Sequence, residues 1–262
     1  MDGITVRNLR VSYGTKTVID GLDVNIPAGK VTTVIGPNGC GKSTMLKAVG
    51  RLVASSGEVL LGGRDVRAMP RKQLATLLSM LPQSPTAPEG LLVKDLVGRG
   101  RHPHQTWFNQ WSSTDREVVA DALAQTQSTD LANRDINQLS GGQRQRVWIS
   151  MVLAQQTPTM LLDEPTTYLD LSTSIDVLNL VRRLNTQLDR TVVMVLHDLN
   201  LAARYSDHLL VIRDGALHAA GSPADVITPD LLRSVFDLEA LVEEDPAVGG
   251  PLIIPAAPVG KR

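Results

Sequence analysis

The hydrophobic pattern of this chain is a series of short, continuous apolar runs separated by stretches of helical periodicity. The runs are residues 31–35, 159–162, 191–196 and 208–212. A strand that is buried on both faces shows no alternation of polar and apolar positions, so each run predicts a fully buried strand. Strands that alternate with helices form a mostly parallel sheet, and the pattern therefore predicts an α/β fold.

Shorter signals surround these runs. Further strands are predicted at residues 4–6, 23–26 and 57–61. Residues 42–52 predict a helix close behind the first buried run. Another helix is predicted where apolar residues recur at helical spacing, and its apolar face should pack against the sheet. These apolar residues are Ile175, Leu178, Val181, Leu184 and Leu188.

The middle of the chain has a different character. From residue 86 to 139 the strand signals vanish and helical stretches such as 114–125 replace them, which predicts a separate helical subdomain. Thr114 and Glu117 have the spacing of a capping box at the start of that helix. The tail from residue 243 is rich in Pro and Gly, and residues 252–254 predict a short edge strand within it.

Composition excludes several classes of protein. The 262 residues carry a formal charge of −1, which argues against a nucleic-acid surface, and Arg99, Arg101 and His102 are expected on a solvated face. No run reaches the ~18 apolar residues of a membrane helix, and the N-terminus lacks a secretion signal. The single cysteine, Cys40, permits no internal disulfide and suits a reducing compartment. We therefore expect a soluble, cytosolic protein that reaches any membrane through a partner.

A glycine-rich loop follows the first buried run and precedes the helix 42–52. It reads Gly36-Pro37-Asn38-Gly39-Cys40-Gly41-Lys42-Ser43-Thr44. The glycines let successive N–H groups point inward at an anion, and the helix N-terminus adds its dipole. In such a loop Lys42 reaches the β- and γ-phosphates, Ser43 binds Mg²⁺, and Thr44 meets the α-phosphate region. A glycine turn with a surface lysine is the alternative, and the position between strand and helix disfavours it.

Two carboxylates end the apolar run 159–162. Asp163 should emerge at the carboxyl edge of the sheet, where it can hold Mg²⁺ through water. Glu164 is our candidate for the general base that activates the attacking water. An isolated Asp-Glu pair is more often a pair of solvated carboxylates, and only the upstream phosphate loop reverses that preference.

The segment Leu139-Ser140-Gly141-Gly142-Gln143 lies between these two motifs. Ser140 and the amides of Gly141 and Gly142 can donate to an anion at a helix start, although a plain helix cap is the alternative. With this segment in place, the chain resembles an ATP-binding cassette (ABC) ATPase. The resemblance implies a P-loop NTPase (RecA-like) core with an antiparallel β edge and an inserted helical subdomain. It implies an ATPase domain at 1–242, with a core lobe of 1–85 and 157–242 and a helical subdomain of 86–156, before the tail 243–262.

Further site residues are implied by the resemblance. Tyr13 matches the aromatic residue that stacks on adenine, and Gln83 matches the glutamine that meets Mg²⁺ or water and senses the membrane partner. Asp170 matches the loop that crosses the dimer interface, and His197 matches the histidine that contacts the γ-phosphate. The predicted nucleotide-binding residues are thus Tyr13, Gly36 to Thr44, Gln83, Ser140 to Gln143 and Asp170. Lys42, Glu164 and His197 are the predicted catalytic residues, and Ser43, Gln83 and Asp163 the predicted Mg²⁺ ligands.

Longer strings narrow the branch of the family. Residues 162–170, 197–205 and 100–104 resemble importers of ferric siderophores and the related haem and cobalamin importers. Within the helical segment, the aromatic residues Trp107, Phe108 and Trp111 are expected to form a small core, or to face the groove for a permease helix. His102 and His104 resemble a pair of metal ligands, but no third ligand lies nearby in the sequence, so we favour their placement in a surface loop. Cys40, beside Lys42 and a helix N-terminus, suggests a thiol that is unusually reactive when the loop holds no ATP, although a small space-filling residue is the alternative.

The resemblance implies a mechanism and a set of partners. Two copies pair head to tail, so that each ATP lies between Lys42 of one copy and Ser140 to Gln143 of the other. The homodimer docks on separate permease subunits at the cytoplasmic face of the membrane, and a substrate-binding protein delivers the cargo. ATP and Mg²⁺ are the implied cofactors, ferric siderophores the favoured cargo, and no nucleic acid is a partner.

Three rival classes remain. A non-transport cassette protein of DNA repair or ribosomes typically has a coiled-coil insertion or a second cassette, and this sequence has neither. A phosphate-loop kinase has no need of residues 139–143. A catalytically dead cassette is disfavoured because Glu164 and His197 are both intact.

Overall fold

Buried parallel strands form where the apolar runs predict them. In the computed structural model, which describes residues 3–105 and 111–259, β3 (Val31–Ile35) pairs in parallel with β8 (Thr191–Val195) and β9 (His208–Arg213). Every residue of β3 and β8 is buried, as expected for strands covered on both faces. The antiparallel strand β10 (Ala216–Gly221) pairs with β9. The predicted α/β fold is confirmed.

The chain packs as two compact units. Unit 1 comprises residues 1–68 and 191–262, and unit 2 comprises residues 69–190. These boundaries differ from the domain boundaries predicted from the sequence, 1–85 with 157–242 and 86–156, which stay a prediction. Each unit is described by itself below.

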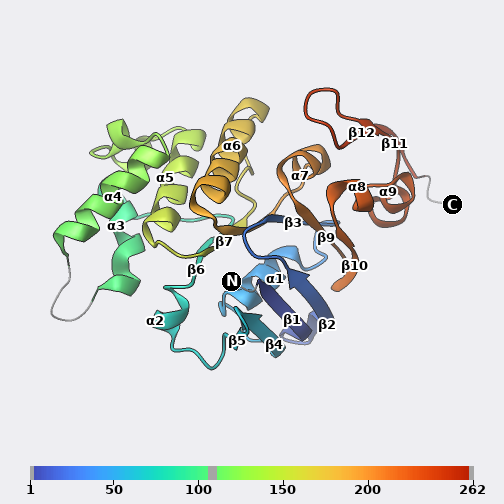
Figure 1. Cartoon of the computed structure of the whole chain (residues 1–262), viewed down its shortest axis with the longest axis horizontal. Coiled ribbons are helices and arrows are strands. Elements are labelled where there is room, and N and C mark those ends of the chain that lie inside the picture. Colours follow the sequence, from blue (N-terminus) through green and yellow to red (C-terminus); the bar gives the residue numbers. More distant parts are fainter. Residues whose placement is uncertain (1–2, 106–110, 260–262) are drawn as a thin grey trace. The chain divides into compact units, whose positions relative to one another are not determined.

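Unit 1 opens with an antiparallel sheet whose strands run in the order β2-β1-β4-β5 (Figure 1). The strands are β1 (Ile4–Tyr13), β2 (Lys16–Ile26), β4 (Ser56–Leu61) and β5 (Arg64–Asp65). Apolar residues of β1 and β2, such as Val6 and Val24, are buried in register with each other. This sheet is the antiparallel edge that the family resemblance implied, and helix α1 (Lys42–Val49) lies between its second and third strands in the sequence.

The C-terminal part of unit 1 is ordered rather than a loose tail. After α7 (Leu199–Tyr205), α8 (Pro223–Val226) and α9 (Pro229–Phe236), β11 (Leu238–Glu244) and β12 (Pro251–Pro258) form a two-stranded antiparallel sheet. The strand predicted at 252–254 therefore exists and is longer. Asn200 on α7 exchanges two hydrogen bonds with the backbone of Ile253, at 2.7 and 3.1 Å, which fastens β12 to α7.

Unit 2 contains one parallel strand pair and most of the helices. Strand β6 (Leu78–Leu81) pairs with β7 (Thr159–Asp163), and the predicted helical segment lies between them in the sequence. The α-helices of this unit are α2 (Arg71–Leu74), α3 (Val93–Gly98), α4 (Ser113–Gln125), α5 (Gly141–Ala154) and α6 (Leu171–Leu188). Short 3₁₀ helices are η1 (Arg99–His104), η2 (Thr129–Leu131) and η3 (Ile136–Gln138). Helices α3 and α4 both pack on α5.

Helix α6 follows its predicted periodicity only in part. Leu178, Val181 and Leu184 are buried as the spacing requires, whereas Ile175 is half-buried and Leu188 is exposed near the helix end. Across residues 3–105 and 111–259, no helix combines the length and apolar character of a membrane span.

Two expectations about the helical segment were wrong. The capping box of α4 is formed by Ser112 and Asp115 rather than by Thr114 and Glu117, because the N-cap lies two residues earlier than the spacing suggested. Arg101 does not lie on a solvated face: its side chain is 5% exposed and its Nε donates to Asp115 Oδ1 at 2.9 Å. A second carboxylate oxygen of Asp115 accepts from the backbone N–H and the hydroxyl of Ser112.

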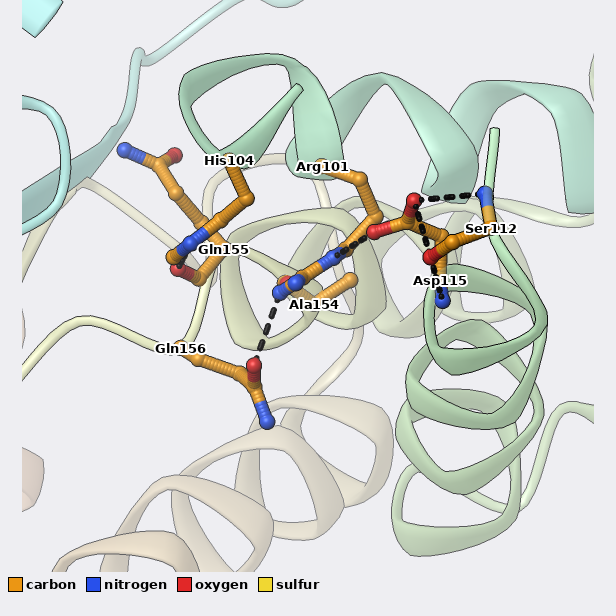
Figure 2. A network of polar contacts seen from close by, with 7 residues as sticks. All are labelled: Arg101, His104, Ser112, Asp115, Ala154, Gln155 and Gln156. Atoms are coloured by element: carbon orange, nitrogen blue, oxygen red, sulfur yellow. Dashed lines mark hydrogen bonds and ion pairs between the residues drawn. The ribbon is translucent and has the colours of Figure 1, made fainter. Parts of the chain in front are cut away.

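The Arg101 guanidinium also closes the C-terminal end of α5. Its Nη1 donates to the carbonyl oxygen of Ala154 and to Oε1 of Gln156, both at 2.8 Å, while the ring of His104 contacts the carbonyl oxygen of Gln155 (Figure 2). A cation suits this position because the last carbonyls of a helix lack intrahelical partners and carry negative partial charge. One buried ion pair therefore ties η1 and α4 to the end of α5.

We predict that this ion pair contributes strongly to stability. Asp115→Asn leaves a buried guanidinium without its carboxylate and should lower the free energy of unfolding by about 3–5 kcal/mol. Urea denaturation of Asp115→Asn, Arg101→Met and the double variant measures the coupling, because the double variant should lose less than the sum of the two. Additive losses would contradict the pairing.

The same pair should make stability depend on acid pH. Burial acts to raise the pKa of Asp115, but hydrogen bonds from Ser112 and Arg101 and the nearby guanidinium charge outweigh it and lower the pKa from 3.8 to about 2. A depressed folded-state pKa means that this contribution is complete above about pH 4 and is lost as the pH falls toward about 2. The gap in unfolding free energy between wild type and Asp115→Asn should therefore narrow over that range.

Candidate functional site

The phosphate loop joins β3 to α1 in unit 1, and its glycines have positive φ angles. Gly36, Gly39 and Gly41 have φ angles of 150°, 78° and 108°. At Gly36 a Cβ atom would lie 2.0 Å from the carbonyl oxygen of Ile212 on β9, so no larger residue fits there. The sequence pattern of the loop therefore corresponds to a tight backbone curl between a buried strand and a helix.

Lys42 points into this curl rather than outward. The residue is 5% exposed, and its ammonium donates to the carbonyl oxygens of Gly36 and Pro37 at 2.8 Å each. Ser43 and Thr44 follow, half-buried, in the first turn of α1. A loop of this kind that encloses an ammonium at a helix N-terminus has the chemistry of a phosphate cradle, and the surface-lysine alternative is excluded.

Cys40 contradicts the expectation of a reactive thiol. The side chain is 6% exposed, and burial raises the pKa of the thiol even though the Lys42 charge acts to lower it. A buried thiol that stays protonated reacts slowly, because the thiolate is the nucleophile.

We therefore expect slow alkylation of Cys40 in the folded chain. At about pH 7, iodoacetamide should modify the native protein at least about tenfold more slowly than the urea-unfolded protein, as followed by mass spectrometry. The result is unambiguous because Cys40 is the one cysteine of the sequence. Equal rates in the two states would restore the reactive-thiol hypothesis.

Two more predicted site residues belong to unit 1. Tyr13 is 47% exposed at the end of β1, where it pairs with Lys16 across the turn. His197 is exposed directly after the buried residues of β8 and before α7, whose N-cap Asp198 accepts from the N–H of Leu201. The side chains of Tyr13 and His197 are thus accessible, as a role in binding requires.

The acidic strand end lies in unit 2, and the structure joins it to Gln83. Asp163, the last residue of β7, is 1% exposed and Glu164 is 9% exposed. The amide Nε2 of Gln83, two residues after β6, donates to Oε2 of Glu164 at 2.6 Å. Glu164 also has a left-handed backbone, with φ of 53°. These are not two solvated carboxylates before a turn, because both are buried and the base candidate is held in place.

Ser140 to Gln143 begin helix α5 in unit 2. Ser140 is the N-cap: its hydroxyl accepts from the N–H of Gln143, and Oε1 of Gln143 accepts from the N–H of Ser140. Gly142 packs so closely on α6 that a Cβ atom would lie 2.4 Å from Cγ2 of Thr173. The segment is a capping box, yet the Ser140 side chain and Gly141 remain exposed, so the cap and an anion site are compatible.

Asp170 has a structural role that the sequence did not reveal. It is the N-cap of α6, and its two carboxylate oxygens accept from the N–H and the hydroxyl of Thr173 at 2.9 and 2.8 Å. The backbone and hydroxyl hydrogen bonds from Thr173 lower the pKa of Asp170. The carboxylate is therefore ionised at neutral pH.

Each unit by itself carries groups whose chemistry fits a nucleotide and a hard divalent cation. In unit 1, Lys42 supplies a buried positive charge and Ser43 a hydroxyl oxygen, and in unit 2, Gln83 and Asp163 carry an amide and a carboxylate oxygen. Within the described ranges, no group of three or more His, Cys, Asp or Glu side chains could hold a metal alone.

The remaining sequence candidates lie in the helical segment of unit 2. His102 and His104 are exposed on the 3₁₀ helix η1 rather than in a loop, and the ring of His104 contacts the carbonyl oxygen of Gln155. Trp107 and Phe108 lie outside the described residues. Trp111 is 45% exposed, but its ring covers Gly98 at the end of α3.

A phosphate loop between a buried strand and a helix, with an acidic strand end and a capped Ser-Gly-Gly-Gln helix start, defines the class of P-loop ATPases. Residues 19–167 match the family model described as ABC transporter. The chain belongs to the ABC transporter family, as one of its ATP-binding, ATP-hydrolysing subunits.

The curated relatives match nearly the whole chain. The chain is 51% identical over 256 residues to the probable siderophore transport system ATP-binding protein YusV of Bacillus subtilis, covering 97% of this chain and 93% of that protein. It is 50% identical over 253 residues to the petrobactin import ATP-binding protein FpuD of Bacillus anthracis, covering 96% and 93%. The cobalamin import ATP-binding protein BtuD of Halobacterium salinarum is 42% identical over 253 residues, covering 96% and 63%.

Solved structures share the fold. A metal-chelate type ABC transporter in an inward-facing conformation matches with a TM-score of 0.85 and 27% identity, covering 97% of each chain. The dimeric structure of MJ0796, a bacterial ABC transporter cassette, matches with a TM-score of 0.74 and 28% identity, covering 84% of this chain and 98% of that one. The predicted fold class, a cassette ATPase with an antiparallel edge and a helical insertion, is confirmed.

Proposed function

We propose that this subunit hydrolyses ATP to power the import of ferric siderophores through a separate membrane permease. The observation that carries the proposal is 51% identity over nearly the full length to a siderophore transport subunit, with every catalytic motif intact. The buried, hydrogen-bonded carboxylate of Glu164 supports hydrolysis rather than binding alone.

In the proposed mechanism the phosphate loop and Lys42 hold the ATP phosphates, and Tyr13 stacks on adenine. Ser43, Gln83 and Asp163 would hold Mg²⁺, which would supply positive charge to the phosphate oxygens. Glu164 takes a proton from water while the water oxygen bonds to the γ-phosphorus and the bond to the β-phosphate oxygen breaks. His197 contacts the γ-phosphate, and the products are ADP and phosphate.

The proposed assembly is a head-to-tail homodimer at the cytoplasmic face of the membrane. Ser140 to Gln143 of one copy complete the nucleotide site of the other, and Asp170 lies in the segment that crosses the interface. Tyr168 and Leu171, which flank Asp170, are 93% and 64% exposed, as expected of side chains that a partner covers. The dimeric cassette structure among the similar proteins supports this arrangement.

The same proposal assigns the other partners. Permease subunits receive the homodimer, and a substrate-binding protein delivers the chelate to them, while no nucleic acid takes part. Cobalamin or haem import is the second candidate for the cargo. The 42% identity to a cobalamin import subunit favours it less than the siderophore relatives do.

Uptake of radio-labelled iron from a panel of siderophores tests the proposal. A strain that lacks the gene is complemented with wild type, Lys42→Ala or Glu164→Gln. Restoration of uptake by wild type and by neither variant supports the proposal and identifies the chelate. If no siderophore uptake depends on the gene, labelled haem and cobalamin decide between the second candidate and a non-transport role.

A further inference from the structure

Thr167 makes two contacts with the candidate base that neither the motifs nor the relatives assign. Its hydroxyl donates to Oε2 of Glu164 at 2.8 Å, and its backbone N–H donates to the carbonyl oxygen of Glu164 at 3.3 Å. The two residues are three positions apart, on either side of Pro165 and Thr166. Thr167 therefore closes a turn that begins at Glu164 and binds the side chain of the same residue.

The turn holds an unfavourable backbone conformation. Glu164 has φ of 53°, a left-handed angle that costs a residue with a Cβ atom about 1–2 kcal/mol. Such a conformation persists only where surrounding contacts fix it, and the backbone hydrogen bond to Thr167 is one of them. The direction in which the Glu164 carboxylate leaves the strand end thus depends on this turn.

Oε2 of Glu164 also accepts from Gln83, so two neutral donors from separate segments converge on one carboxylate oxygen. A carboxylate oxygen has about two lone-pair directions, and here both are taken. Hydrogen bonds to a carboxylate restrict its rotation and stabilise its charged form. The two bonds to Oε2 orient the whole carboxylate group, and with it the oxygen that takes the proton from water.

We propose that Thr167 is a positioning residue that aims the Glu164 carboxylate for proton transfer. The inference rests on the proposed role of Glu164 as the general base. Thr167 acts through Glu164: the hydroxyl fixes the carboxylate, and the backbone N–H fixes the turn. The backbone contact survives any side-chain change, so the hydroxyl can be tested alone.

The test compares Thr167→Val, which is nearly isosteric but has no hydroxyl, with Thr167→Ser, which keeps it. In the full chain with MgATP, Thr167→Val should lower kcat about ten- to hundredfold, the range for losing a hydrogen bond to a charged group, at an unchanged KM for ATP. Thr167→Ser should restore kcat to within a few-fold of wild type.

Thermal unfolding of each variant and binding of a fluorescent ATP analogue show whether the valine chain is folded and binds nucleotide. A folded Thr167→Val chain with wild-type kcat would overturn the inference, and so would a Thr167→Ser chain whose kcat is no higher than that of Thr167→Val. Glu164→Gln separates this failure from that of the proposed function. If Glu164→Gln still hydrolyses ATP, the base itself is misassigned. If Glu164→Gln loses turnover but Thr167→Val does not, the base is correctly assigned and only the role of Thr167 is wrong.

Discussion

Glu164→Gln is expected to abolish ATP turnover while ATP binding is retained. The substitution keeps the size and an oxygen acceptor for Gln83 and Thr167 but cannot take a proton from water. The loss of a general base lowers kcat by about 10²- to 10⁴-fold. Phosphate release from the full chain measures turnover, and equilibrium binding of a fluorescent ATP analogue measures affinity, which should change by no more than a few-fold.

Glu117→Gln is the matched control for this prediction. Glu117 is exposed on α4, so the same change of charge away from the strand end should leave both turnover and affinity unchanged. Turnover above about a tenth of wild type in Glu164→Gln would contradict the assignment of the base. Loss of ATP binding in Glu164→Gln would instead point to a role for the carboxylate in holding the nucleotide.

Gly36→Ala is expected to destroy nucleotide binding and to destabilise unit 1. The new methyl group would lie 2.0 Å from the carbonyl oxygen of Ile212 and 2.9 Å from Sγ of Cys40, so the loop or β9 must move. The neighbours on one side are backbone of a buried strand, which cannot give way cheaply. Moving the loop displaces the carbonyl oxygens that hold Lys42, and the phosphate cradle is lost.

Gly62→Ala separates this clash from the cost of the backbone conformation. Gly62 has φ of 57° and a Cβ atom there would meet nothing within 4 Å, so its substitution should cost only about 1–2 kcal/mol and leave ATP binding intact. Thermal unfolding and ATP-analogue titration of the two variants give the comparison. A Gly36→Ala chain that binds ATP as tightly as Gly62→Ala would contradict the cradle geometry.

The buried strands were predictable because their environment leaves a simple sequence trace. The five residues of β3 are continuously apolar or threonine, and the predicted and observed bounds agree. Strands β1 and β2 extend well beyond the predicted residues 4–6 and 23–26, and the added residues include buried apolar ones such as Leu9 and Ile19. The pairing of β1 with β2 shifts register after Val6, and such an irregularity interrupts the two-residue alternation from which a strand is predicted.

The candidate site could be predicted only from its motifs in combination, because an isolated Asp-Glu pair is more often solvated and only the phosphate loop upstream gives it another meaning. The failures concern burial and pairing. From the sequence alone, Arg101 cannot be distinguished from an arginine on the surface. Its neighbours in the sequence do not indicate that it forms a buried ion pair with Asp115, fourteen positions later. Cys40 seemed reactive from its neighbours, but its burial decides the opposite. Thr167 was missed because a threonine three residues after a glutamate is an ordinary turn pattern.

Helix α5 has a mechanical property that follows from its two ends. Its first residues are fixed by the Ser140–Gln143 capping box, and its last carbonyls are fixed by Arg101 (Figure 2). A helix of 14 residues spans about 21 Å and resists bending when neither end frays. Fraying is therefore opposed at both ends, which favours a constant separation between η1 and Ser140.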